Sequence, residues 1–228
     1  MKLKSIENLL DYTIDAFDKY VDKELKPFKA LTRTYKIYLQ TKTMSEKDLV
    51  QGMNSLHLEP KLTWDMVSQK VSIVGRQLLC SAFSTQADMI HRPGSKRVFI
   101  VDSKIYVVIN KESLSRLILD NLFRFDDFIE YDLKIIARHE VGHVIDAIIN
   151  DGIPEDEFIE RKRKKDEAFD KYIKYTNSDN SDADEATKLY YAIPNEAAAN
   201  NIVGLTCKDI ISMNHKRAKK HKFNIKID

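Results

Sequence analysis

The stretch Ala137-Arg138-His139-Glu140-Val141-Gly142-His143-Val144-Ile145-Asp146 decides how this chain is interpreted. It contains His-Glu-x-x-His, the smallest pattern that builds a catalytic zinc site on a helix. At about 3.6 residues per turn, His139 and His143 lie one above the other and can offer two imidazole nitrogens to one metal ion. Glu140 lies one step around the helix, where a carboxylate can take a proton from an attacking water and return it to a leaving group.

The flanks of this motif predict that its helix is mostly buried. On the motif alone, a surface helix carrying two solvated His and one Glu is an alternative. In a buried helix these side chains need partners, and a metal ion supplies them. Gly142 costs about 1 kcal/mol relative to Ala inside a helix, so it predicts a close packing partner at this point. The apolar flanks are Leu133, Ile135, Ile136, Ala137, Val141, Val144, Ile145, Ala147, Ile148 and Ile149.

A downstream segment offers the third protein ligand that a catalytic zinc site needs. Pro194 interrupts the chain before a short Ala-rich helix, and Asn195 is predicted as its N-cap. Glu196 and Asn200 share a face of that helix. Glu196 can therefore bind the metal while Asn200 accepts a hydrogen bond from the other ring nitrogen of a ligand His. In isolation a solvated Glu is the simpler interpretation, and only the upstream motif favours a ligand.

The combination of His139-Glu140-x-x-His143 with Asn195-Glu196-Ala197-x-x-Asn200 resembles the zincin metallopeptidases of the gluzincin type, such as the thermolysin-like enzymes. The resemblance implies that His139, His143 and Glu196 are zinc ligands and that Glu140 is the general base. The thermolysin pattern has Asp where this chain has Asn200, so the charge that would make a ligand His more basic is missing. The gap between His143 and Glu196 is also much longer than in thermolysin.

A second similarity is to the ImmA/IrrE-like intracellular peptidases, which place a β-hairpin and a linking helix just before a His-Glu-x-x-Gly-His segment. In this chain, Arg97 to Val101 and Ile105 to Asn110 flank Asp102-Ser103-Lys104 and predict a hairpin. A linking helix is expected over Ser113 to Phe123, and the metal helix over Asp126 to Asn150. One hairpin strand is interpreted either as the edge that aligns a substrate backbone or as a cap on a helical core.

Composition and charge agree with an intracellular enzyme. The 228 residues have a formal net charge of +2 and are 32% charged, which is not the balance of a general nucleic-acid binder. Cys80 and Cys207 give neither a disulfide framework nor a cysteine zinc site. The N-terminus has Glu7 too early for a signal peptide, and no run of 18 apolar residues exists. We therefore expect a cytoplasmic protein with a protein or peptide substrate and no membrane partner.

The first ninety residues predict helices. Ile6 to about Gln40 has helical periodicity with an interruption near Pro27. A second helix is expected from Ser45 to about Ser55, and a third from Trp64 to about Met89, ended by His91-Arg92-Pro93-Gly94.

A charged insert separates the two halves of the predicted site, at about residues 153–190. Glu155 to Tyr175 predicts a solvated helix, and Asn177 to Asp184 has almost nothing to bury. This segment is interpreted as a surface loop, or as a lid or substrate selector near the cleft. The basic tail Lys216 to Lys222 lacks interleaved aromatic residues for base stacking, so a nucleic-acid partner is not expected.

Together these patterns predict an α+β, mainly helical fold, with an N-terminal helical region at 1–90 and a zincin-like core at 91–228. The predicted function is a zinc-dependent endopeptidase; the alternative is a zincin-fold regulatory or binding protein with little or no peptidase activity. A peptide deformylase would need a Cys ligand, and Cys80 lies far upstream on a predicted helix. Candidates for the donor that stabilises the oxyanion, by their nearness to Glu196 in sequence, are Tyr190, Tyr191 and His215.

Overall fold

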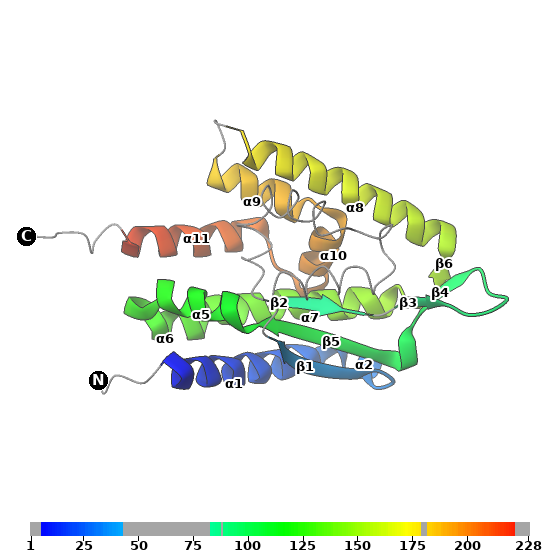
Figure 1. The fold of residues 1–228 in the computed structure, drawn as a ribbon, viewed down its shortest axis with the longest axis horizontal. Helices are drawn as coiled ribbons and strands as arrows, with labels where there is room; N and C mark the ends of the chain where they lie inside the picture. Colours follow the sequence, from blue (N-terminus) through cyan, green and yellow to red (C-terminus); the bar gives the residue numbers. More distant parts are fainter. Residues whose placement is uncertain (1–5, 43–82, 88, 179–181, 222–228) are drawn as a thin grey trace, which may run out of the picture.

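The structure is a computed structural model that describes residues 6–42, 83–87, 89–178 and 182–221. As the sequence predicts, it is mainly helical with a small β component (Figure 1). The expected helices at Ser45 to Ser55 and over most of Trp64 to Met89 lie outside the described residues. No helix in the described ranges is long and apolar enough to cross a membrane.

The larger sheet has three strands in the order β1-β5-β2, namely β1 (Lys36–Lys42), β5 (Lys104–Asn110) and β2 (Phe83–Gln86). The central strand β5 pairs in parallel with β1 and antiparallel with β2. Its residues Val107 to Asn110 are all buried, so both faces of this strand are covered there. The smaller sheet has the antiparallel order β3-β4-β6, namely β3 (Met89–His91), β4 (Arg97–Ile100) and β6 (Ile153–Pro154).

The predicted hairpin is wrong, although both of its strands exist. Strand β4 belongs to the smaller sheet and β5 to the larger one. Between them the 3-10 turn η2 (Val101–Ser103) places Asp102 at φ 49° and Ser103 at φ 52°. These left-handed residues redirect the chain, so β5 pairs with the distant strands β1 and β2 instead of with β4. The strand pattern is local, whereas the choice of partner is not.

The predicted N-terminal helix is correct only in its first part. Helix α1 (Ile6–Leu25) is followed by the 3-10 helix η1 (Lys26–Phe28), with Pro27 in its first turn, and by the short α2 (Lys29–Thr32). The segment up to Gln40 was predicted as helix but forms β1, and the end of the third predicted helix forms β2 and β3. In both places pairing within a sheet overrides a helical apolar pattern.

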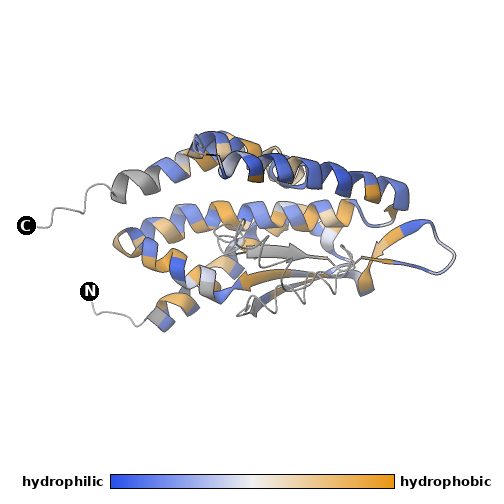
Figure 2. Cartoon of the chain, turned by 45° about the horizontal axis from the view of Figure 1, so that its top comes forward, coloured by the Kyte–Doolittle hydropathy of each residue, from blue (hydrophilic) through white to orange (hydrophobic). Residues whose placement is uncertain are grey.

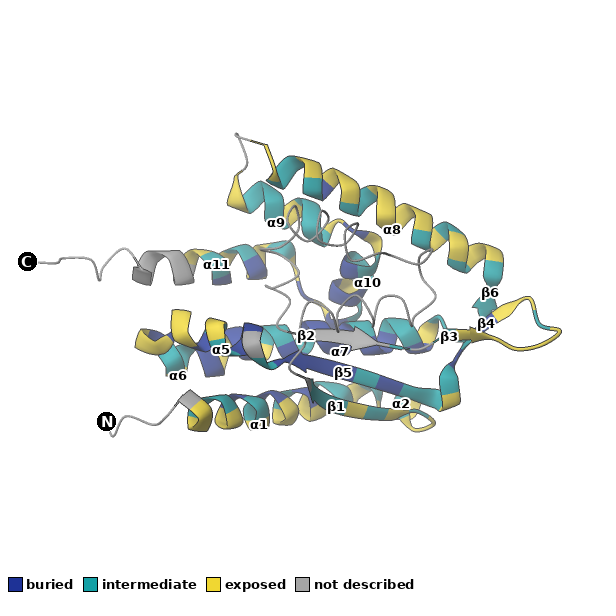
Figure 3. Cartoon of the chain, viewed as in Figure 1, coloured by how far each residue is buried: buried dark blue, intermediate teal, exposed yellow. Residues whose placement is uncertain are grey.

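Helix α7 (Leu133–Ile149) carries the His-Glu-x-x-His motif and lies at the centre of the molecule (Figure 3). It packs against α1 and the larger sheet on one side, and against α10 (Pro194–Val203) on the other. Phe17 and Val21 of α1 are buried in the same core as Val141, Val144 and Ile145 of α7. As predicted, a helix links β5 to this region: α5 (Lys111–Asp120), followed by η3 (Leu122–Arg124), α6 (Phe125–Asp127) and the π-helical turn η4 (Phe128–Asp132).

The C-terminal end of α7 is held by Asp151. One carboxylate oxygen of Asp151 accepts a hydrogen bond from the Ile100 backbone N–H at 2.7 Å, and the other accepts one from the Tyr35 hydroxyl at 2.9 Å. Burial and these contacts with Asp151 raise the pKa of Tyr35 to about 12. Asp151 thus links α7 to β4 and to the turn before β1.

The predicted insert forms a long helix and a short one. They are α8 (Glu155–Thr176) and α9 (Ala183–Tyr191), and α11 (Cys207–His221) follows α10. Most of α8 is hydrophilic, as expected for a solvated helix, but α8 also packs against α9 and α10 (Figures 1 and 2). The side chain of Tyr172 is buried in that packing.

Candidate metal centre

The two motif histidines face the same point beside α7. His139 is buried and His143 is half-buried, and their Nε2 atoms lie 3.1 Å apart. Their rings meet edge to face with centroids 4.6 Å apart. The four-residue spacing of the motif produces this arrangement, because it places both imidazoles on one face of the helix.

Glu196 brings a third donor atom to this point from α10. Its Oε2 lies 3.1 Å from Nε2 of His139 and 3.3 Å from Nε2 of His143. Four ligands in a tetrahedron, each about 2.0 to 2.1 Å from a zinc ion, lie about 3.3 to 3.4 Å from one another. The three donor atoms therefore have nearly the spacing of three corners of a zinc site. They form a cluster that can hold a metal ion, as predicted.

The close approach of α7 and α10 brings these ligands together. A Cβ built at Gly142 would lie 2.7 Å from the carbonyl carbon of Ala199 and 2.9 Å from its Cα, closer than side chains approach backbone. The predicted close packing at Gly142 is confirmed, and the partner is the Ala-rich helix that carries Glu196. Small residues on both helices are thus needed for the His and Glu donors to meet.

Two asparagines hold the ligands in place. Nδ1 of His139 lies 2.8 Å from Oδ1 of the buried Asn200, so this nitrogen donates the hydrogen bond and leaves Nε2 to face the metal position. This is the contact predicted for Asn200. The predicted N-cap role of Asn195 is wrong: the cap is Ile193, Pro194 begins the helix, and the Asn195 amide instead donates to Oε1 of Glu196 at 2.8 Å.

The ligand side chains influence one another's ionisation. Burial lowers the pKa of His139, but the hydrogen bond to Glu196 and the charges of Glu140 and Glu196 outweigh it, and the pKa is raised overall. Burial raises the pKa of Glu196, but its contacts with His139 and His143 outweigh that effect and hold the pKa well below its ordinary value. Glu196 is therefore an anion at neutral pH, as a metal ligand must be.

Glu140 is buried on α7 beside the ligands. Its charge contributes to the raised pKa of both His139 and Tyr190. Glu140 therefore lies on the same helix as His139 and His143, next to His139 in sequence, and its charge influences the candidate site.

Two of the three candidates for oxyanion stabilisation lie at the site. The Tyr191 ring meets the edge of His139 with centroids 5.5 Å apart. Burial and the charges of Glu196, Tyr191 and Glu140 raise the pKa of Tyr190 well above its ordinary value, so its hydroxyl keeps its proton and can donate. His215 is exposed on α11, where its Nε2 lies 2.8 Å from the Asp184 carboxylate.

Sequence reasoning missed three residues around the site. Asn195 holds Glu196, as described above, and Tyr172 reaches Tyr190 from α8 with ring centroids 5.3 Å apart. Burial raises the pKa of Asp146, and the charge of His143, one turn away, opposes that rise. The spacing of Asp146 three residues after His143 is the one signal in the sequence that could have found it.

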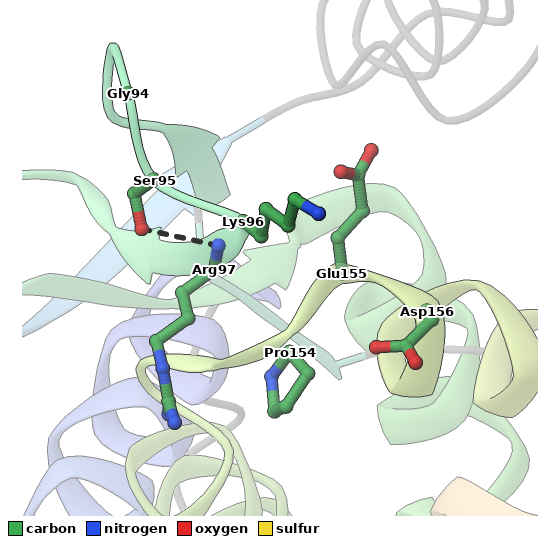
Figure 4. A pocket seen from close by; sticks show the side chains of 7 residues that line it. All are labelled: Gly94, Ser95, Lys96, Arg97, Pro154, Glu155 and Asp156. Carbon is green, nitrogen blue, oxygen red and sulfur yellow. Dashed lines mark hydrogen bonds between the residues drawn. The ribbon is translucent and has the colours of Figure 1, made fainter.

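A concave region lies apart from the candidate ligands, at the smaller sheet and the start of α8 (Figure 4). There Arg97 donates from Nη1 to the Gly152 carbonyl at 2.6 Å, and from its backbone N–H to Ser95 Oγ at 3.1 Å. Both contacts are structural, and the lining contains none of the ligand residues. The lining residues are Gly94, Ser95, Lys96, Arg97, Pro154, Glu155 and Asp156.

Comparison with family models, with curated proteins and with solved structures finds no match for this chain. The functional argument therefore depends on the geometry of the site.

Proposed function

We propose that this protein is a zinc-dependent endopeptidase that hydrolyses peptide bonds of an intracellular protein. The observation that carries the proposal is the convergence of His139 Nε2, His143 Nε2 and Glu196 Oε2 within 3.1 to 3.3 Å of one another. Two imidazoles and one carboxylate are a donor set of catalytic zinc, which leaves a fourth position open for water and substrate.

The donor set fits zinc better than the hard cations. Ca²⁺ and Mg²⁺ prefer six or more oxygen ligands, whereas two of the three donors here are imidazole nitrogens. The hydrogen bond from His139 to Asn200 also fixes which ring nitrogen faces the metal.

The chain's own residues supply the remaining parts of a peptidase site. A bound zinc ion would polarise the scissile carbonyl and acidify water. Glu140 then takes the proton of the attacking water and delivers it to the departing amine. Tyr190 donates a hydrogen bond from its protonated hydroxyl to the oxygen on which negative charge develops, and Tyr191 packs against His139.

Strand β2 supports the peptide as substrate class. The predicted aligning edge cannot be β4 or β5, because each of these strands has a neighbour on both sides. Within the described residues β2 pairs only with β5 and contacts α7, so an edge strand of the larger sheet lies beside the metal helix. An extended substrate backbone can add to this edge by hydrogen bonding of the main chain.

A second candidate function is a regulatory or binding protein that uses the metal for stability alone. The observation in its favour is Asn200, because a neutral amide makes His139 less basic than the carboxylate of thermolysin-like enzymes would. Glu140 separates the two functions, since a purely structural metal does not need it.

The test combines metal analysis with cleavage by matched variants. Purified wild type should contain one zinc ion per chain, and His143→Ala should contain none. Glu140→Gln should keep the zinc and lose cleavage, with fragments sought by comparing cellular proteins incubated with wild type and with this variant. Wild type without metal would end the proposal. If zinc-loaded wild type gives the same fragments as Glu140→Gln, the peptidase function is excluded and the regulatory or binding function remains.

A further inference from the structure

The aromatic side chains near the metal centre form a continuous series that begins in the insert. The ring centroids are 5.3 Å apart for Tyr172 and Tyr190, 5.1 Å for Tyr190 and Tyr191, and 5.5 Å for Tyr191 and His139. The interplanar angles are 64°, 87° and 85°, so each ring meets the next nearly edge to face. Such pairs each contribute about 0.5 to 1.5 kcal/mol beyond the area they bury.

Tyr172 differs from the rest of its helix. The α8 surface is dominated by ion pairs with high exposure, such as Arg161 with Glu157 and Arg163 with Glu160. Tyr172 is only 8% exposed and contacts Phe169 on its own helix at 6.1 Å between centroids. A helix with so few buried side chains places one of them directly against Tyr190.

We propose that Tyr172 is a positioning residue, whose ring fixes the orientation of Tyr190 at the metal centre. Tyr190 has edge-to-face neighbours on both sides, Tyr172 and Tyr191. Its side chain has only two rotatable angles, so two ring contacts are enough to select one rotamer. The insert helix α8 is therefore part of the catalytic architecture, and the proposal depends on the function proposed above.

Misplacement of a donor affects the transition state more than substrate binding. A hydroxyl aimed at the developing oxyanion acts mainly on kcat, and a displacement of about 1 Å can lower the rate by about a hundredfold. Tyr172→Ala should therefore lower kcat by about tenfold to a hundredfold with little change in KM. Tyr172→Phe keeps the ring and should retain most of the activity.

A double-variant experiment separates positioning from general support of the fold. If Tyr172 acts through the Tyr190 hydroxyl, Tyr172→Ala should have no further effect on kcat once Tyr190→Phe has removed that hydroxyl. Equal loss of kcat in both backgrounds would overturn the proposal, and so would full activity of Tyr172→Ala. Should Tyr172→Ala not fold, Tyr172→Leu, which keeps apolar volume but has no ring edge, takes its place with the same expected results.

The matched control is Tyr175→Ala, the same change one turn further along α8. The Tyr175 hydroxyl accepts a hydrogen bond from the Asp182 backbone N–H at 3.0 Å, at the start of α9. This variant should keep kcat. Crystal structures of the variants give a readout besides activity: Tyr190 should keep its rotamer in Tyr175→Ala and leave it in Tyr172→Ala. An unchanged Tyr190 rotamer in Tyr172→Ala would contradict the inference.

Failure of the proposed peptidase function can be distinguished from failure of the proposed role of Tyr172. Wild type without zinc or without cleavage contradicts the peptidase function itself. The other outcome is a wild type that binds zinc and cleaves, while Tyr172→Ala and Tyr190→Phe lower kcat independently. That result contradicts only the positioning role.

Discussion

Gly142 on α7 lies against the backbone of Ala199 on α10, so closely that a Cβ at Gly142 would be 2.9 Å from the Ala199 Cα. The two helices carry the three candidate ligands, His139 and His143 on one and Glu196 on the other. The distance between the helices is therefore also what sets the distance between the ligands.

Gly142→Ala should damage the metal centre through this contact. Backbone atoms cannot rotate away, so the helices must separate, at an expected loss of about 1 to 3 kcal/mol in the free energy of unfolding. Thermal unfolding and zinc content would measure both effects. Gly94→Ala is the control: its added Cβ meets no atom within 4 Å, and only its φ of 78° is strained. Zinc binding by Gly142→Ala equal to that of wild type would show that the site tolerates separation of the helices.

Asn200→Ala should weaken zinc binding without removing a ligand. Loss of the hydrogen bond to Nδ1 frees the His139 ring to reorient, and such supporting contacts contribute about tenfold to a hundredfold in metal affinity. Asn200→Asp restores the carboxylate of the thermolysin pattern and should bind zinc at least as tightly as wild type. Competition with a chelator measures the zinc affinity of both variants. Equal affinity of Asn200→Ala and wild type would contradict the role assigned to Asn200.

Zinc affinity should fall as the pH falls through the raised pKa of His139. A protonated imidazole cannot bind the metal, and contacts with Glu196 and Glu140 raise this pKa above its ordinary value of about 6.5. Affinity should thus be constant at high pH and begin to decrease above pH 6.5, by about tenfold per unit for one proton. Glu196 has a lowered pKa and stays ionised throughout this range. Chelator competition between about pH 5.5 and 8.5 tests the direction, and affinity that rises on acidification would contradict it.

The N-terminal helix should be indispensable for folding. Phe17 is fully buried in the core that contains α7, and Phe→Ala in such a position costs about 3 to 5 kcal/mol. Phe17→Ala should lower the melting temperature sharply, whereas the exposed Tyr12→Ala, on the same helix, should lower it much less. Deletion of residues 1–90 also removes β1 and β2 and should leave an unfolded remainder by circular dichroism. A folded, zinc-binding remainder would show instead that residues 91–228 form a unit by themselves.

The sequence could identify the candidate site because its signals are local or nearly so. The spacing of His139 and His143 is set by one helix, and Glu196 and Asn200 are likewise one turn apart on another. The interior Gly142 predicted a close neighbour, and the structure shows that this neighbour is the Ala-rich helix α10. Tyr172 was missed because its contact with Tyr190 joins two helices and leaves no periodic pattern. Asn195 was missed because nothing in the sequence shows that its side chain binds the adjacent Glu196.

What the sequence determined by itself is the set of ligand types, their spacing along each helix, and a mainly helical fold with strands at β4 and β5. The tertiary structure alone decided that β4 and β5 belong to different sheets and that the segment up to Lys42 is a strand. It also decided that Tyr172 of the insert helix α8 packs against Tyr190. Helical periodicity is a property of neighbouring residues, whereas strand pairing and the contact between two distant helices depend on which surfaces are buried together.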